Sequence, residues 1–343
     1  MSLVLFISLI RIKHSKTHAT PSVSVIVSAR NESAHITECL TSLSRLIYPP
    51  DKLEFIIVND RSTDNTGELI DRFIEQHSHF KAIHITTPHS FLSGKAGALS
   101  HAIQISRSDI IFVTDADCIV PERWIEQMVP YFDTDVGIVA GFTLIKSMSG
   151  KFSLFDKIQT LDWFYLLTIA SGAAGLGIPL SCVGNNFAFR KQAYSDVGGY
   201  EGVGYSLTED FALLNAIRCK TSWQMRFPLL PDALVVTKPI SSISGFIRQR
   251  KRWATGALKV HPFGKLLIAI SLLTSLFLVV SLLHITPSWI MYTALLLFFS
   301  ADMLILGFTL TKTKTRHWLI YYPAFKFFHL LYLILLPILL LLK

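Results

Sequence analysis

Runs of apolar and β-branched residues alternate with helical patterns along the first part of the chain. The runs VSVIV, EFIIV, AIHI and IIFV predict strands at 23–27, 54–58, 82–85 and 110–113. Apolar residues at helical spacing predict helices near 34–45, 66–76, 96–106 and 122–131. Strand–helix repeats of this length are typical of an α/β domain with a mostly parallel sheet and helices on both faces.

Three long apolar runs follow Phe263, at 264–285, 288–310 and 318–342. Each has about the twenty residues that a helix needs to cross a hydrocarbon core of roughly 30 Å. We therefore expect three transmembrane helices after the α/β domain.

The charges between these runs predict their orientation. The connection TKTKTR, within 311–317, is basic, whereas HITPS at 284–288 has no Lys or Arg. Because positive charge is retained on the cytoplasmic side, 311–317 should lie in the cytoplasm and 284–288 outside. We therefore expect an integral protein of the cell membrane whose α/β domain is cytoplasmic and meets the activated metabolites of the cell.

The N-terminal segment, MSLVLFISLIRIKHSK, has its basic residues after the apolar run, the reverse of a secretory signal. We expect a short hydrophobic anchor over 1–20, a catalytic domain with interfacial helices over 21–262 and a transmembrane region over 263–343. The 343 residues, 51% of them apolar and with a formal net charge of +8, allow one sizeable soluble domain beside the membrane helices.

The cysteines have no spacing that indicates a shared role. Cys39, Cys118, Cys182 and Cys219 form no paired pattern. This usage predicts neither a zinc site nor a disulfide framework, and it fits a reducing compartment.

Polar loops follow each predicted strand: SARNES, NDRSTD, TTPHSFLSGKAGAL and TDADC. Ligands of such sheets bind beyond the carboxyl ends of the strands. Each of the acids Glu32, Asp60, Asp115 and Asp117 would by itself be read as a turn residue or a cap. Several acids converging on one sheet edge repel one another and need a cation or hydrogen-bond donors between them.

The segment DAD should place Asp115 and Asp117 on the same side of an extended segment, because strand side chains alternate with period two. Two carboxylates together with substrate phosphates commonly hold Mg²⁺ or Mn²⁺. The chain has neither GxGxxG nor GxxxxGK[ST], but Lys95 opens a predicted helix from which it can reach a phosphate. The alternative is a solvated lysine.

Two further polar segments each allow two interpretations. In TEDFALLNAIR, Thr208 is a good N-cap, and Glu209 and Asp210 would follow in the first helical turn, where negative charge is favoured. RQRKRWATG, before the first apolar run, fits a basic segment at a membrane surface. The functional alternative is that Arg252 neutralises a pyrophosphate while Trp253 stacks beside an acceptor.

In order, Asp60, DAD at 115–117, TED at 208–210 and QRKRW at 249–253 resemble the D, DxD, TED and QxxRW motifs of membrane-integrated family 2 glycosyltransferases, the group that contains cellulose, hyaluronan and ceramide sugar transferases. The resemblance extends over about 21–260. It implies a GT-A fold and a metal-dependent hexosyltransferase of the inverting type.

The resemblance also implies a role for each motif residue. The nucleoside pocket, usually for uridine, would be formed by Ala29, Asn31, Glu32 and Asp60, and the nucleotide sugar would be contacted by Lys95 and Asp115. Asp117, with Asp115, would hold Mg²⁺ or Mn²⁺, and Asp210 would be the catalytic base. The diphosphate would be covered, and the acceptor bordered, by Gln249, Arg252 and Trp253, and Glu209 would also touch the acceptor. One departure is Arg30, which stands where an aromatic residue is common in the family, so the identity of the nucleobase that the pocket binds is open.

The segment 150–172 has apolar residues at helical spacing, among them Phe152, Phe155, Ile158 and Leu161. It fits either a core helix or, as the resemblance implies, a helix on the bilayer surface beside the acceptor. We expect transfer of a sugar from a UDP-sugar to a lipid hydroxyl. The alternative is a processive polysaccharide synthase. A third possibility, an inactive membrane scaffold, is disfavoured because the acids of all four motifs are intact. No nucleic-acid partner is expected.

Two charges lie in the apolar region without a motif. Asp302 precedes the cytoplasmic end of the second apolar run by the same distance as Lys326 follows the cytoplasmic start of the third. A lone charge at that depth is costly by a few kcal/mol. We therefore predict an ion pair between Asp302 and Lys326. In the alternative, Lys326 extends to the cytoplasmic surface, and Asp302 is either protonated or bonded to Ser300 or Tyr322.

Overall fold

The structure, a computed structural model, describes residues 2–11, 20–87, 92, 94–147, 152–257, 260–283 and 289–341. The chain forms two compact units. The sheet unit comprises Ile12–Leu144 and Ser181–Lys238, and the helical unit comprises Met1–Arg11, Ile145–Leu180 and Pro239–Lys343. In this division 145–180 and 239–262 group with the apolar helices, and the expected domain boundaries at 20/21 and 262/263 stay predictions.

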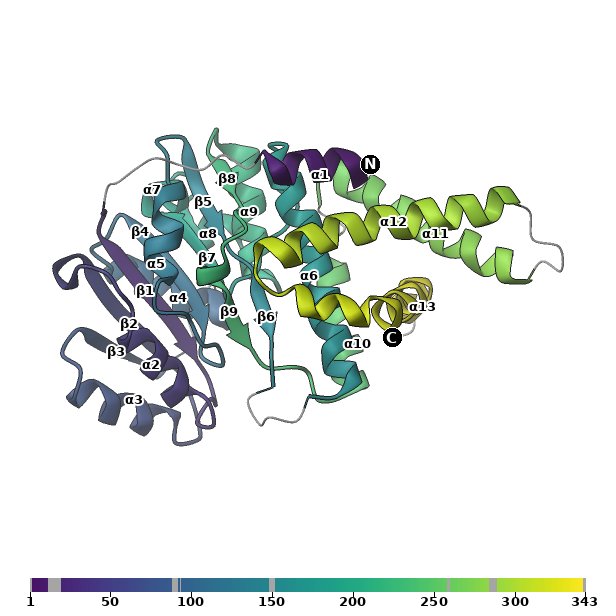
Figure 1. Ribbon diagram of the computed structural model, residues 1–343. Coiled ribbons are helices and arrows are strands. Elements are labelled where there is room, and N and C mark those ends of the chain that lie inside the picture. Colours follow the sequence, from purple (N-terminus) through teal and green to yellow (C-terminus); the bar gives the residue numbers. More distant parts are fainter. Residues whose placement is uncertain are drawn as a thin grey trace. The chain divides into compact units, whose positions relative to one another are not determined.

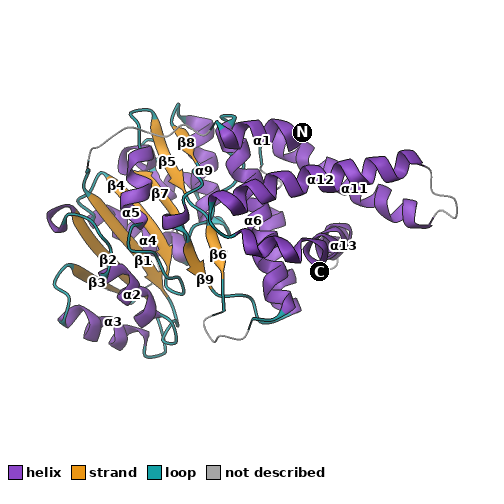
Figure 2. Cartoon of the chain, viewed as in Figure 1, coloured by secondary structure: helices purple, strands orange, loops and turns teal. Residues whose placement is uncertain are grey.

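The sheet unit contains a seven-stranded sheet of order β3-β2-β1-β4-β7-β5-β8 (Figures 1 and 2). Its strands are β1 (Val23–Ala29), β2 (Leu53–Asp60), β3 (Phe80–Ile85), β4 (Ile110–Asp115), β5 (Val136–Ala140), β7 (Phe187–Arg190) and β8 (Gln224–Arg226). The four strands expected from the apolar runs are confirmed, and they pair in parallel. β7 is antiparallel to both β4 and β5, and the sheet is therefore mostly, but not entirely, parallel. β6 (Thr143–Ile145) pairs separately with β9 (Val235–Thr237).

Helices cover both faces of this sheet. They are α2 (Ile36–Ser44), α3 (Thr66–Glu75), α4 (Lys95–Ile105), α5 (Trp124–Met128), α7 (Lys191–Ser195), α8 (Gly199–Val203) and α9 (Glu209–Lys220). Val25 lies in one apolar core with residues of α2 and α5. Its neighbour Ile26 points to the opposite face because strand side chains alternate, and α4 packs against β1 and β2 without joining that core. The expected two-faced α/β arrangement is confirmed.

The helical unit contains α1 (Ser2–Ile10), α6 (Leu154–Gly175), α10 (Ile243–Ala257), α11 (Pro262–Leu283), α12 (Trp289–Lys312) and α13 (Tyr322–Leu341). α6 starts at a capping box, in which Ser153 Oγ accepts from the Asp156 amide and the Asp156 carboxylate accepts from the Ser153 amide. The three long apolar runs are therefore helices, α11 to α13, as expected from their composition.

Membrane crossing is a separate matter from helix formation. Among the described residues, one helical stretch, Arg316–Leu335, is long and apolar enough to cross a membrane, and Pro262–Phe277 is a shorter apolar helix. The connection at 284–288, expected outside the cell, falls beyond the described residues. Large apolar side chains are exposed on all three helices, for example Leu273 at 66%, Leu296 at 67% and Phe327 at 73%.

The segment predicted to be either a core helix or an interfacial helix is α6. Its residues Ile158, Leu161 and Phe164 are buried, whereas Phe152, just before the helix, and Phe155 are half-buried. α6 packs against α1, α12 and α13 within the helical unit. Most of its apolar side is therefore covered by protein, and a position at the bilayer surface stays a prediction.

Candidate active site

The candidate site lies where β1, β2 and β4 end. Ala29 at the end of β1 is in register with Asn59 of β2, and Ser28 is in register with Asp115 of β4. Parallel pairing therefore brings the three loops after these strands to one edge of the sheet, as the sequence predicted.

The loop after β1 is tied to the loop after β2. Asn31 has a positive φ of 58°, a conformation that asparagine tolerates better than most residues. Its Oδ1 accepts a hydrogen bond of 2.8 Å from the amide of Thr63. The amide of Glu32 donates to Thr66 Oγ1 at 2.8 Å. The two loops thus form one ordered wall at the edge of the sheet.

Asp60 ends β2 and is almost fully buried, at 4% exposure. Both of its carboxylate oxygens accept from the guanidinium of Arg61, at 2.7 Å from Nε and 3.2 Å from Nη2. Arg61, which we did not single out from the sequence, adopts a φ of 56°. The bidentate pair fixes the orientation of the Asp60 carboxylate.

The DAD segment brings its acids together by a different geometry from the one expected. β4 ends at Asp115, and the next residues turn, with the amide of Cys118 donating to Asp115 O at 3.1 Å. Asp117 is therefore not part of an extended segment, and the predicted strand alternation is wrong there. The turn still holds carboxylate oxygens of Asp115 and Asp117 and the Sγ of Cys118 within 4.8 Å of one another.

Lys95 is the first residue of α4, as the sequence predicted, and it is not a solvated lysine. Its Nζ lies 2.5 Å from Asp115 Oδ1 and 3.1 Å from Glu209 Oε1, and the side chain is 26% exposed. Although burial works to lower it, the carboxylates of Asp115 and Glu209 hold the pKa of Lys95 well above its usual value. One cation therefore serves acids from two different motifs.

Thr208 stands at the N-cap of α9, and Glu209 and Asp210 form its first turn, as the sequence predicted. The Thr208 side chain, however, makes no capping hydrogen bond; Ser206 Oγ bonds both the amide and the carbonyl of Thr208. The Asp210 carboxylate is held by the amides of Phe211, at 2.7 Å, and of Gly184.

Gly184 allows this close approach, and the sequence interpretation had not assigned it a role. A Cβ at this position would lie 3.2 Å from Asp210 Oδ2 and 3.3 Å from Lys95 Nζ. A side chain would therefore press on both charged groups. Gly184 lies in the segment VGNNFAFRK, 26 residues before Asp210 in the sequence, and only the fold brings the two together.

The acids of the site raise one another's pKa. Burial and the Glu209 carboxylate raise the pKa of Asp210 to about 6, against the opposing effect of Lys95. Burial and then Asp115 raise the pKa of Asp117, and burial and then Asp117 raise that of Glu32. Lys238, also unassigned from the sequence, lies 3.8 Å from Asp117 and offsets part of this repulsion. The cluster has more negative charge than its lysines neutralise.

The last sequence motif lies in the helical unit. Gln249, Arg252 and Trp253 are residues of α10; Arg252 is exposed, and the other two are half-buried. Their expected contact with a diphosphate and an acceptor stays a prediction.

Comparison with known proteins identifies the family. A family model described as Glycosyl transferase family 2 matches residues 24–198, just over half of the chain. The chain belongs to glycosyltransferase family 2. The match covers β1 to β4 and the acids Asp60, Asp115 and Asp117.

Among curated proteins, this glycosyltransferase is 31% identical to the probable glycosyltransferase YdaM of Bacillus subtilis, over 69% of this chain and 55% of that protein. It is 28% identical to the poly-β-1,6-N-acetyl-D-glucosamine synthase of Staphylococcus epidermidis, over 72% of this chain and 57% of that protein. It is also 28% identical to the β-monoglucosyldiacylglycerol synthase of Synechocystis, over 69% of this chain and 48% of that protein. The chain thus spans about half the length of these relatives.

A solved structure has a similar fold. The mannosyltransferase PcManGT of Pyrobaculum calidifontis, in complex with GDP-Man and Mn²⁺, aligns with a TM-score of 0.60 and 22% identity, over 94% of this chain and 93% of that chain. At this identity the likeness concerns the fold alone, which is the GT-A-like α/β fold expected from the sequence.

Proposed function

We propose that this glycosyltransferase moves a sugar from a UDP-sugar to a hydroxyl group of a membrane lipid, with inversion at the anomeric carbon. The observation that carries the proposal is the arrangement around Asp210. Its carboxylate is fixed by two amides and lies beside Lys95, which in turn contacts Asp115 of the DAD segment.

Asp210 is suited to act as the base. A general base is most effective when its pKa lies near the working pH, and burial and Glu209 raise the pKa of Asp210 to about 6. In the proposed step, Asp210 takes the proton of the acceptor hydroxyl as its oxygen attacks the anomeric carbon. The bond from that carbon to the diphosphate breaks, and the diphosphate leaves with the electron pair.

The other motif residues bind and orient the donor in this proposal. Asn31, Glu32 and Asp60 form the wall for the nucleoside, and Ala29 ends the strand beneath it. Lys95 and Asp115 contact the sugar diphosphate, with Lys95 offsetting negative charge on the leaving group. Gln249, Arg252 and Trp253 of α10 are assigned to the diphosphate and the acceptor, and Glu209 to the acceptor, on the resemblance.

The DAD turn fits a divalent cation. Asp115 and Asp117 offer carboxylate oxygens, which Mg²⁺ and Mn²⁺ prefer. Burial and the two acids hold the pKa of Cys118 well above its usual value, so its thiol stays protonated and leaves a set of oxygen ligands. When bound, the cation would neutralise charge on the diphosphate.

The lipid acceptor is proposed from the helical unit. α11, α12 and α13 expose large apolar side chains. Hydroxyls in these helices bond the carbonyl four residues earlier, as Thr274 does with Ile270 at 2.8 Å, so they need no water. A glycolipid synthase is among the relatives. The second candidate function is that of a polysaccharide synthase. It is favoured by the similarity to the poly-β-1,6-N-acetyl-D-glucosamine synthase.

Product analysis tests the proposal. The purified full chain would receive labelled UDP-sugars, or GDP-sugars in parallel, with a membrane lipid extract and Mn²⁺. We expect one short glycolipid by mass spectrometry, made from a UDP-sugar, and lost with EDTA or with Asp210→Asn. A glycosidase-sensitive polymer would support the synthase instead, and a product unchanged by Asp210→Asn would refute the assigned base.

A further inference from the structure

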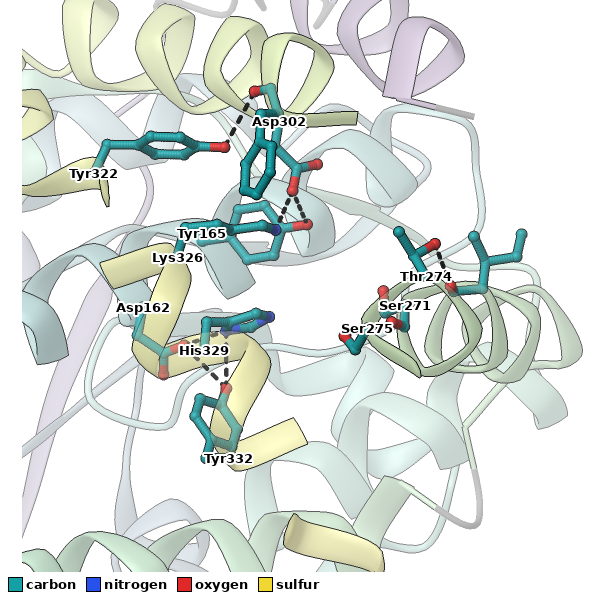
Figure 3. A network of polar contacts seen from close by, with 12 residues as sticks. Asp162, Tyr165, Ser271, Thr274, Ser275, Asp302, Tyr322, Lys326, His329 and Tyr332 are labelled. Atoms are coloured by element: carbon teal, nitrogen blue, oxygen red, sulfur yellow. Dashed lines mark hydrogen bonds and ion pairs between the residues drawn. The ribbon is translucent and has the colours of Figure 1, made fainter. Parts of the chain in front are cut away.

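Asp162, in the middle of α6, is the hub of a buried polar network in the helical unit (Figure 3). It is 0% exposed. Its Oδ1 lies 2.7 Å from His329 Nδ1 and accepts from the Tyr332 hydroxyl at 2.9 Å, both on α13. Its Oδ2 accepts from Arg250 Nη2 on α10. Because a carboxylate only accepts, the proton between it and the imidazole is on Nδ1 of His329.

Arg250 belongs to the QRKRW segment but points away from solvent. It is 5% exposed, and its Nε and Nη1 have no hydrogen-bond partner among the described residues. The guanidinium carbon lies 4.2 Å from the ring centre of Trp253 and 4.4 Å from that of Phe246. The cation is thus held between the Asp162 carboxylate and the aromatic rings of its own helix.

One face of α6 contacts both the motif helix and the chain that leads into it. Gln159, Asp162 and Trp163 follow helical spacing and share that face. Gln159 Nε2 donates to Ile240 O at 3.0 Å, and the Ile240 amide donates to Gln159 Oε1 at 3.1 Å. The ring of Trp163 lies 4.8 Å from that of Trp253, between centroids. Contacts therefore run from just before α10 to the last residue of QRKRW.

We infer that Asp162 is a positioning residue for sugar transfer, which through Arg250 sets the orientation of α10 and so of Arg252 and Trp253. Arg250 and Trp253 are neighbours on one side of α10, whereas Arg252 is exposed and available to a ligand. The inference rests on the proposed function, because the role of the QxxRW residues in transfer is part of that proposal. No described contact of Asp162 is to a residue assigned to the donor or the base.

The test compares two matched substitutions. Asp162→Asn removes the charge that faces Arg250 and keeps the size of the side chain. Asp302→Asn makes the same change in another buried pair of the helical unit, where Asp302 contacts Lys326 of α13 and Tyr165 of α6 rather than α10. A milder variant, Gln159→Leu, removes the two hydrogen bonds to Ile240 without touching a charge.

Two readouts separate positioning from stability. By hydrogen–deuterium exchange, amides of 243–257 should exchange faster in Asp162→Asn and Gln159→Leu, and at the wild-type rate in Asp302→Asn. At saturating donor, turnover should fall about 10- to 100-fold in Asp162→Asn, because small displacements of positioning groups are costly. UDP affinity should fall by a smaller factor than turnover, because Arg252 is only one of the groups assigned to the diphosphate, and folded Asp302→Asn should keep both its turnover and its UDP affinity.

Unchanged exchange across 243–257 in both α6 variants would overturn the inference, as would an equal loss of turnover in Asp302→Asn. If Asp162→Asn does not fold, Gln159→Leu decides by the same two readouts. A wild-type chain that transfers no sugar would refute the proposed function, whereas the exchange experiment would still decide whether Asp162 holds α10.

Discussion

Asp210 in the sheet unit is half-buried and Asp162 in the helical unit is fully buried, and their environments drive their pKa in opposite directions. Burial and Glu209 raise the pKa of Asp210 to about 6, because Lys95 offsets only part of their effect. Burial also acts to raise the pKa of Asp162, but Arg250 and His329 outweigh it and hold that pKa below its usual value. The difference is the supply of cations. Lys95 is shared among several acids, whereas Asp162 has a guanidinium of its own.

The two environments have opposite consequences for folding. Asp210 has a folded-state pKa above its unfolded value, so any stability that it contributes is present at low pH and is lost as pH rises through about 6. Asp162 has a lowered pKa, so its contribution is present above the unfolded pKa and is lost as pH falls through the folded value. The comparison indicates that the candidate site keeps a proton acceptor at the expense of stability.

The largest expected effect is that of Asp210→Asn. Loss of a positioned base typically lowers turnover roughly 10²- to 10⁴-fold. UDP affinity should persist in a titration, and the thermal midpoint should not fall, because a neutral amide does not bear the cost of a buried charge among acids. A loss of UDP affinity or of stability comparable with the loss of turnover would contradict the contrast with Asp162.

The pair of Asp302 and Lys326 extends the comparison to an ion pair that lies entirely within the apolar helices. Asp302→Asn or Lys326→Met alone should lower the free energy of unfolding in detergent by about 3–5 kcal/mol, since each leaves one buried charge unpaired. The swap Asp302→Lys with Lys326→Asp should recover much of this loss. Recovery should be incomplete, because the Tyr165 hydroxyl donates to Asp302 at 3.2 Å. Simple additivity of the single changes would show that the contact carries no coupling energy.

The smallest effect is expected in the pH profile. If Asp210 is the base, kcat/KM for the acceptor should reach a plateau above about pH 6 and fall about tenfold per pH unit below it, because the carboxylate must be unprotonated to accept a proton. The residual activity of Asp210→Asn should lack this limb. An acid limb near pH 4 in the wild type would mean that the surrounding acids do not act on the base.

The strands β1 to β4 could be predicted because each is a compact apolar run that ends in a polar loop, and parallel pairing then places those loops together. β7 and β8 could not, because they are short and because β7 reverses direction within the sheet. The separation of 145–180 from the sheet unit was also out of reach. A helix of apolar periodicity such as α6 has the same pattern in a core, at an interface or between units.

The charges show the same limit. The Asp302–Lys326 pair was predicted and is confirmed by the structure, because two opposite charges at equal depth in apolar helices each need a partner. The Asp162 network was missed, since Arg250 was read as one more cation of a basic surface segment, and Asp162 lies 88 residues from Arg250 and 167 from His329. Likewise, the acids of the site were predicted from the motifs. The contacts of Arg61, Gly184 and Lys238 with these acids could not be predicted, because they depend on the folded arrangement of the chain.

The spacing of that network also affects how the chain is made. Arg250 leaves the ribosome 88 residues after Asp162, and His329 follows 167 residues after it. At about 5–20 residues per second, roughly 4–18 s pass before the carboxylate meets its guanidinium, and twice as long before the imidazole arrives. During that interval α6 carries an acid without its buried partners, so we expect α6 to reach its final place only after α10 has been made. The helical unit is therefore completed late in synthesis, whereas β1 to β4 and the helices between them are already available to pair.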